Sequence, residues 1–264
     1  MNNDVNSLFD DLSKLSEVEA IALGGSRAGV VYDEKSDYDV YLYCTAPVPE
    51  QVRRELLGRY CSRIEIGNSF WEYEDNCVLN SGIDIDILYR NLDEFGAGIS
   101  RVVDDCNASN GYTTCMWHNL KTCKILYDRD GRLTALQARY SCEYPEKLRT
   151  NIIDRNMRLL RYSMPAYSTQ IKKAVERGDL VSVNHRVTEY LASYFDIIFA
   201  YNKLTHYGEK RLVSLCEKNC KQLPKDFKVN LERLFADMFT DSTAVIGDIE
   251  RITDNIEQLV CPRP

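Results

Sequence analysis

The chain has 264 residues, enough for one large domain or two smaller ones, each with its own core. It is 44% hydrophobic and 28% charged, as globular proteins are, and it has no run of about eighteen apolar residues that could cross a membrane. Forty acidic residues against 33 basic ones give a net charge of −7. This charge disfavours a nucleic-acid partner, because a general nucleic-acid binder needs a basic face.

The cysteines and the first residues of the chain favour a reduced, cytoplasmic environment. Ten cysteines are scattered without the spacings of a disulfide framework, so we expect free thiols. The segment that begins at Met1 has neither the basic flank nor the apolar stretch of a secretory signal. We therefore expect a cytoplasmic protein that does not bind membranes, while its oligomeric state stays open.

Short apolar segments with strand-like alternation fill the first half of the chain. They are Val18–Leu23, Tyr38–Cys44, residues 64–66 and residues 83–89. Residues 49–60 have helical spacing instead, with Val52, Leu56 and Leu57 on one side. Strands and helices in this mixed order predict a sheet with helices packed against it, in the α+β or α/β class.

The second half of the chain has a different apolar period. From about Leu133, apolar residues recur at three- and four-residue intervals, as in amphipathic helices. The runs are residues 148–160, residues 187–201, and a third that comprises Val229, Leu231, Leu234, Phe235 and Met238. A polar segment around Asp130 and Gly131 predicts the turn between the halves. We therefore predict one domain over residues 1–130 and an all-helical domain over residues 131–264.

A glycine turn closes the first predicted strand, with the sequence Gly24, Gly25, Ser26 and Arg27. Glycines at a strand end allow a tight turn, and the N–H groups and hydroxyl that follow can bind phosphate. On its own, this pattern is equally typical of a simple connection between a strand and a helix.

Paired aspartates mark two later strands. Asp37 and Asp39 are two residues apart, so they project from one face while the apolar residues between and after them face the core. Two like charges on an apolar strand are costly without a counter-charge, and Mg²⁺ prefers carboxylate and phosphate oxygens. Asp84 and Asp86 repeat the spacing, and a third carboxylate would complete a site for two ions.

These motifs together resemble the DNA polymerase β-like nucleotidyltransferase superfamily. Gly-Gly-Ser is followed, after a gap of ten residues, by Asp-x-Asp on a strand and later by another strand-borne aspartate. The chain is most similar to bacterial enzymes that adenylylate aminoglycosides and lincosamides, and to their relatives with a helical C-terminal domain. Residues 124–131, 199–203 and 208–211 also resemble segments of these proteins. The resemblance implies a nucleotidyltransferase-type mixed sheet with flanking helices, followed by an all-helical domain.

The resemblance also implies roles for individual residues. Asp37, Asp39 and Asp86 would hold two Mg²⁺ ions. Asp86 is preferred to Asp84 because the segment that it starts, Asp-Ile-Leu-Tyr-Arg, is closer to that of the family. Phosphates of the donor ATP would be bound by the glycine turn and by two basic residues of the second half; this set comprises Gly24, Gly25, Ser26, Arg27, Lys210 and Arg211.

The resemblance also implies a general base, since the family often uses a carboxylate outside the triad to deprotonate the acceptor hydroxyl. Glu189 is the first candidate, on a predicted polar stripe with His185, Asp196 and Lys203. A base on the helical half would place the active site between the two domains. The alternatives, in the polar stretch before the strand of Asp86, are Glu72 and Glu74.

The acceptor follows from charge and from the resemblance. The acidic surface and the catalytic carboxylates favour a small cationic acceptor, such as an aminoglycoside-like antibiotic. The choice of ATP as donor rests on the resemblance alone. Two other functions stay open: a nucleotidyltransferase that modifies a protein or tRNA, and a non-catalytic protein that binds a nucleotide or a partner.

Overall fold

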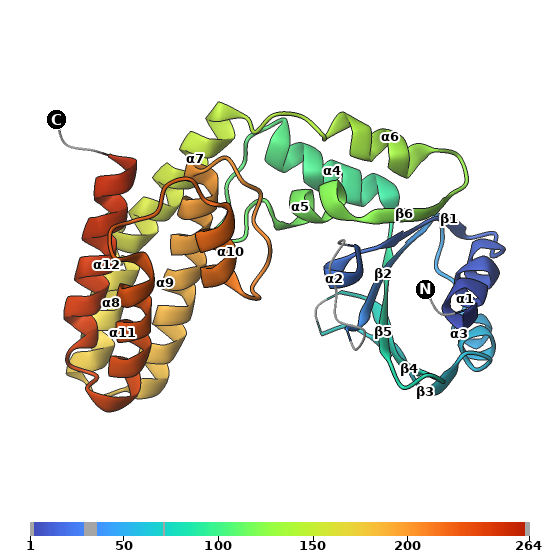
Figure 1. The fold of residues 1–264 in the computed structure, drawn as a ribbon, viewed down its shortest axis with the longest axis horizontal. Helices are drawn as coiled ribbons and strands as arrows, with labels where there is room; N and C mark the ends of the chain where they lie inside the picture. Colours follow the sequence, from blue (N-terminus) through green and yellow to red (C-terminus); the bar gives the residue numbers. More distant parts are fainter. Residues whose placement is uncertain (1–2, 29–35, 71, 262–264) are drawn as a thin grey trace. The chain divides into compact units, whose positions relative to one another are not determined.

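The structure is a computed structural model that describes residues 3–70 and 72–261 except residues 29–35. The chain forms two compact units. Unit 1 comprises Met1–Ser100 and Asn119–Cys142, and unit 2 comprises Arg101–His118 and Glu143–Pro264. Figure 1 shows the elements of both units.

A six-stranded sheet organises unit 1 (Figure 1). The strands lie in the order β3-β4-β5-β2-β1-β6. Strands β2 and β5 are parallel, and all other neighbours are antiparallel. This mixed sheet confirms the predicted fold class. The bounds are Val18–Leu23 (β1), Tyr38–Cys44 (β2), Cys61–Asn68 (β3), Glu74–Leu79 (β4), Asp84–Arg90 (β5) and Lys124–Asp128 (β6).

Helices α1 (Asn3–Ser13) and α3 (Glu50–Leu57) cover one face of the sheet. Alternate strand residues point to this face, because successive side chains of a strand project to opposite sides. The resulting core joins residues of β1, β2 and β5 to those of the two helices, including Leu8, Leu12, Ile21, Val40, Leu42, Leu57, Ile85 and Ile87. Intervening residues of β2 and β5 therefore lie on the opposite face.

The opposite face is partly covered by helices. Helix α2 (Gly25–Ala28) follows β1, while α4 (Leu92–Val103) and α5 (Cys115–Thr122) come after the sheet strands β2 to β5. The ring of Tyr43 on β2 lies 5.5 Å from that of Phe95 on α4. On this face of β2, Tyr41 and Tyr43 are buried, whereas Asp39 is half-buried.

The orientation of α3 differs from the prediction. Val52 is 37% exposed, whereas Arg53 is buried beside the apolar residues of the helix. The reason is a buried carboxylate on β4: Arg53 forms an ion pair with Asp75, which is fully buried. An ion pair beneath the sheet thus replaces the apolar contact expected of Val52.

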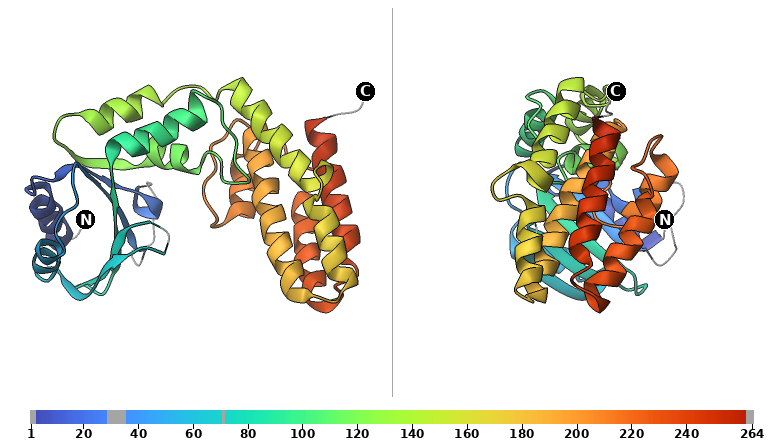
Figure 2. Two further views of the ribbon diagram at one scale, coloured as in Figure 1. Left: turned by 180° about the vertical axis from the view of Figure 1, so that it is seen from behind. Right: turned by 90° about the vertical axis from the view of Figure 1, so that its left-hand side faces the viewer.

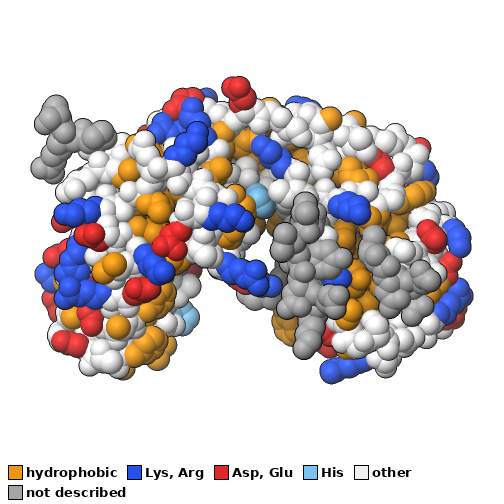
Figure 3. Space-filling model, viewed as in Figure 1, with side chains coloured by type: hydrophobic (Ala, Val, Ile, Leu, Met, Phe, Trp, Pro, Cys, Tyr) orange, Lys and Arg blue, Asp and Glu red, His pale blue; other side chains and the backbone are white. Residues whose placement is uncertain are grey.

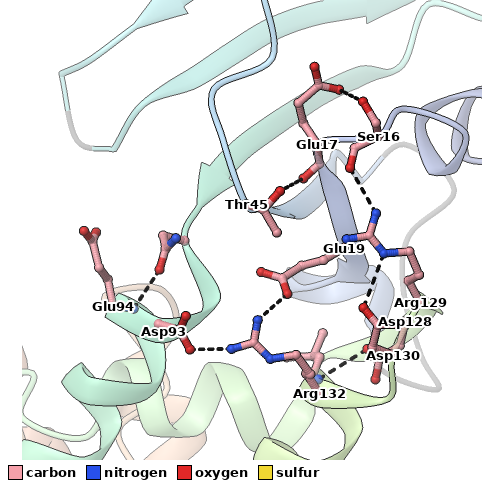
Figure 4. A network of polar contacts seen from close by, with 12 residues as sticks. Ser16, Glu17, Glu19, Thr45, Asp93, Glu94, Asp128, Arg129, Asp130 and Arg132 are labelled. Carbon is pink, nitrogen blue, oxygen red and sulfur yellow. Dashed lines mark hydrogen bonds and ion pairs between the residues drawn. The ribbon is translucent and has the colours of Figure 1, made fainter.

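The segment after β6 packs within unit 1. Figure 4 shows Arg132, at the start of α6 (Arg132–Arg139), between Glu19 of β1 and Asp93 of α4. Helix α6 also lies next to the end of α5, because the Gln137 side chain donates hydrogen bonds to the carbonyl oxygens of Leu120 on α5 and of Cys123 directly after it. The compact units therefore divide the chain differently from the single boundary predicted after residue 130.

All regular structure described for residues 143–261 is helical, as expected for the second half. A π-helical turn, Arg158–Tyr162, extends the first of these helices. Figure 2 shows helices α8, α9, α11 and α12 side by side. The bounds are Glu146–Met157 (α7), Tyr167–Glu176 (α8), Leu180–Tyr201 (α9), Leu212–Asn219 (α10), Phe227–Thr240 (α11) and Val245–Val260 (α12).

Two predicted orientations in unit 2 are wrong. Asp196 is buried rather than on the polar stripe of α9, and its carboxylate accepts hydrogen bonds from Thr113 and Asn156. Burial raises the pKa of Asp196 to about 7, although these hydrogen bonds lower it in part. On α11, Val229 and Phe235 are exposed, because the buried stripe follows a narrower set at three- and four-residue spacing: Leu231, Leu234 and Met238.

No helix within the described residues is long and apolar enough to cross a membrane. The ten cysteines, all of which lie in the described ranges, are free thiols, as predicted.

Candidate active site

Asp39 on β2 and Asp86 on β5 lie directly beside each other. The parallel register pairs the Cα atom of Asp39 with that of Asp86. Both carboxylates lie on the sheet face opposite the core, since their neighbours Val40 and Ile87 are core residues. Adjacent strands are about 4.8 Å apart, so these two half-buried carboxylates are close neighbours.

The other two aspartates occupy less protected positions. Asp37 directly precedes β2 and is exposed, and Asp84 begins β5, where it is exposed and pairs with Val78. The register therefore favours Asp86 over Asp84 as the partner of Asp39. Within the described ranges, no set of three or more His, Cys, Asp or Glu residues is arranged to hold a metal ion.

The glycine turn is in direct contact with Asp39. The backbone N–H of Gly24 donates to the carbonyl oxygen of Asp39 at 2.8 Å. A Cβ atom on Gly25 would lie 1.7 Å from Oδ2 of Asp39, and Gly25 has a φ of +57°. Only glycine fits this close approach without strain. A phosphate bound by the turn would thus lie next to this carboxylate; the Ser26 side chain is outside the described part of the structure.

Behind the turn is a buried platform of polar and aromatic groups. A Cβ atom on Gly24 would lie 2.2 Å from the ring of Tyr41. The Arg90 guanidinium lies 4.0 Å from the centre of the same ring, and it donates two hydrogen bonds of 2.7 Å to Glu72. Asn119 of α5 donates to the Tyr41 hydroxyl at 2.6 Å. The Gly24 backbone therefore rests on a ring that is held from two sides.

Two groups of the platform, Tyr41 and Arg90, have raised pKa values. Burial raises the pKa of Tyr41, so its hydroxyl stays protonated at neutral pH. Burial alone would lower the pKa of Arg90, but hydrogen bonds and charge attraction from Glu72 outweigh it and raise that pKa. Arg90 therefore keeps its positive charge beside Glu72 at neutral pH.

The basic side chains that are predicted to bind phosphate lie in different environments. The Nε atom of Arg27 donates to the Ser36 carbonyl at 2.5 Å, and its guanidinium lies 3.9 Å from the centre of the Tyr38 ring. Arg27 thus has a structural contact in unit 1. Lys210 and Arg211 are exposed in unit 2, directly before α10.

The candidates for the general base also differ. Glu189 is exposed on α9 and lies beside Tyr167, whose pKa is raised by burial and further by the Glu189 charge. Both carboxylate oxygens of Glu72 accept hydrogen bonds from Arg90. Glu74 is half-buried on β4, two residues before Asn76 and hence on the same face as the paired aspartates.

Several polar residues at this site had no signal in the sequence. The Nδ2 group of Asn76 on β4 donates to Oδ1 of Asp86 at 2.7 Å. Strand β4 was not predicted, because it begins with three polar residues, Glu74-Asp75-Asn76. Arg90 is part of the segment that resembles the family, yet its contact with Tyr41 depends on the pairing of β2 with β5.

The two carboxylates fit a divalent cation whose remaining ligands would be phosphate oxygens of the substrate and water. Mg²⁺ in proteins is often held by one or two carboxylates together with phosphate oxygens and water. Asp39 and Asp86 supply such a pair, and the Gly25 backbone approaches Oδ2 of Asp39 this closely only because Gly25 has no side chain. The fit therefore rests on two carboxylates and a glycine turn from three different segments.

Part of the chain matches a known family of unassigned function. The family, described as a domain of unknown function (DUF4037), matches residues 113–210. No curated protein matches the sequence.

Several solved structures are similar to the chain, among them the following three. A nucleotidyltransferase-like protein from Exiguobacterium sibiricum 255-15 is 11% identical with a TM-score of 0.44, over 97% of this chain and 73% of that chain. An aminoglycoside 6-adenyltransferase from Bacillus subtilis is 10% identical with a TM-score of 0.29, over 100% and 94%. A CCA-adding enzyme in complex with CTP is 15% identical with a TM-score of 0.33, over 98% and 70%. Similarity at these identities and TM-scores assigns neither a family nor an activity to this chain.

Proposed function

We propose that the protein is a metal-dependent nucleotidyltransferase that transfers AMP from ATP to a hydroxyl group of a small cationic acceptor. The observation that supports this most is the register of Asp39 with Asp86 beside the turn at Gly25. It combines carboxylates for a cation with a backbone turn for phosphate, and nucleotidyl transfer needs both.

Each group has a proposed role in transfer. Asp39 and Asp86 hold the divalent cation, with Asp37 as the third carboxylate of the set. A bound Mg²⁺ supplies positive charge that neutralises the triphosphate and the leaving pyrophosphate. The backbone around Gly25 binds the phosphates, with the Ser26 hydroxyl, Lys210 and Arg211 as further proposed contacts.

The distribution of charge supports a cationic acceptor. Unit 1 contains 21 acidic and 13 basic residues, a net charge of −8, whereas unit 2 contains 19 acidic and 20 basic residues, a net charge of +1. On the face shown in Figure 3, acidic and basic side chains lie among one another over unit 2. The excess of negative charge thus belongs to the unit that bears Asp39 and Asp86, where it would attract ammonium groups.

The proposal is tested by measuring pyrophosphate release from Mg²⁺-ATP with a panel of aminoglycosides and related antibiotics. Release that depends on one acceptor is the expected result, and isothermal titration of the same acceptor should show binding. If no cationic antibiotic binds while radioactive nucleotide labels tRNA or a protein, the acceptor is a macromolecule. If no nucleotide binds in the presence of Mg²⁺, the class itself is wrong.

A general base is expected to contribute about a hundredfold or more to turnover. We expect Glu74→Gln to lower kcat by this factor, because Glu74 lies on the face of the paired carboxylates. Glu189→Gln is the parallel variant, since Glu189 was the first candidate from the sequence. Steady-state kinetics of both variants decide the assignment: a fall in kcat for Glu189→Gln alone would return the role to that residue.

A further inference from the structure

A chain of side-chain amides leads from Asp86 to the loop after β3. Asn76 on β4 donates from Nδ2 to Oδ1 of Asp86 at 2.7 Å. Asn68, the last residue of β3, donates from Nδ2 to Oδ1 of Asn76 at 2.9 Å. The backbone N–H of Phe70 then donates to Oδ1 of Asn68 at 3.0 Å. Three hydrogen bonds thus connect a proposed cation ligand with a loop two strands away.

The strand pairing and a register shift on β3 bring these side-chain amides into hydrogen-bonding distance of one another. Asn76 and Asp86 are register partners on adjacent antiparallel strands, so their side chains share a face. On β3 the register shifts between Glu65 and Asn68, and Gly67 within this irregularity has a φ of +77°. The shift brings Asn68 close enough to reach across to Asn76.

The direction of this relay is fixed by its far end. A backbone N–H can only donate, so the Asn68 group that meets Phe70 must be its oxygen and the group that meets Asn76 must be its nitrogen. By the same logic, the nitrogen of Asn76 must face Asp86. A flipped Asn76 would place two donors against each other at Asn68 and two acceptors against each other at Asp86.

We infer that Asn76, held by Asn68, is a positioning residue that determines how Asp86 binds a divalent cation; this inference rests on the proposed function. With a hydrogen bond at Oδ1, Asp86 has its Oδ2 atom left for the cation beside Asp39. Asp84, on the same strand, is exposed and pairs with Val78, so it has no such amide opposite it. The relay therefore also explains why only one carboxylate of this strand is suited to the site.

Partners that orient a metal ligand typically account for a 10- to 100-fold effect on metal affinity. We therefore expect Asn76→Leu, which keeps the approximate shape and removes the donor, to raise the Kd for Mn²⁺ by about 10- to 100-fold. Mn²⁺ serves as the probe because its binding can be followed by electron paramagnetic resonance without turnover. Asn68→Ala should raise the same Kd by a smaller factor. In the double variant, Asn68→Ala should add nothing, because the relay is already broken at Asn76.

Asn80→Ala is the matched control, since Asn80 follows the other end of β4 and bonds weakly to the Arg59 carbonyl at 3.5 Å. Its Mn²⁺ affinity should equal that of the wild type. Circular dichroism of each variant excludes loss of the fold. Unchanged Mn²⁺ affinity in Asn76→Leu, or additive effects of the two substitutions, would overturn the inference. Absence of Mn²⁺ binding by the wild-type protein would instead contradict the proposed function.

Discussion

Replacement of Asp39 by asparagine is expected to lower the rate of nucleotidyl transfer by about a thousandfold or more. The substitution keeps the shape of the side chain and removes its charge, so the proposed cation would lose a ligand that lies beside the glycine turn. Metal ions stabilise the charge of such a transition state by several kcal/mol, and each 1.4 kcal/mol corresponds to about a factor of ten in rate. Pyrophosphate release under saturating ATP measures the effect.

Two variants on β5 serve as the control for this experiment. Asp86→Asn should show a loss of activity similar to that of Asp39→Asn, because the two residues are register partners. Asp84→Asn removes the same charge from the same strand at an exposed position, and its activity should stay within about threefold of the wild type. Activity near the wild-type level in Asp39→Asn, or equal losses in Asp84→Asn and Asp86→Asn, would refute the assignment of the cation site.

The sequence predicts those strands whose residues alternate clearly. Strands β1 and β2 have the predicted bounds, because their β-branched and aromatic residues stand between polar or glycine-rich segments. Alternation of apolar and polar residues does not predict strand β4, since the buried Asp75 occupies one of its core positions. The pattern of apolar residues cannot reveal a strand whose core face contains a charged side chain.

The choice between Asp84 and Asp86 shows what sequence alone leaves open. Both residues lie on one face of β5, so alternation treats them alike. Pairing between β2 and β5 favours Asp86, because it aligns Asp39 with Asp86 and not with Asp84. Register depends on contacts between segments that are far apart in the chain, and no local pattern contains it.

Residues that act through others are the hardest to predict. Asn76 and Arg90 belong to strands and have no motif of their own. Their significance comes from what they touch: Asp86 in the first case, and the ring of Tyr41 beneath Gly24 in the second. The motif therefore predicts the groups proposed to contact substrate, while the groups that hold them in place become visible only in the folded chain.

Removal of one partner of the buried ion pair beneath the sheet is expected to destabilise unit 1 strongly. Asp75→Asn should lower the free energy of unfolding by about 3–5 kcal/mol, because it leaves the charge of Arg53 buried and uncompensated. Asp75 also accepts hydrogen bonds from the Tyr89 hydroxyl at 2.8 Å and from the Gly67 N–H at 2.9 Å. Its loss therefore disturbs strands β3 and β5 as well as helix α3. Urea denaturation measures the change as a lower midpoint.

A second ion pair on α3 provides the control. Arg54 and Glu50 are 2.6 Å apart, but their side chains are 51% and 61% exposed. Water screens such a pair and competes for its hydrogen bonds, so Glu50→Gln should cost less than about 1 kcal/mol. Each substitution neutralises a carboxylate that pairs with an arginine of α3, Arg53 in one case and Arg54 in the other. The main difference between the two ion pairs is that the first is buried and the second is exposed. Equal losses of stability would therefore show that the Arg53–Asp75 pair does not depend on its burial beneath the sheet.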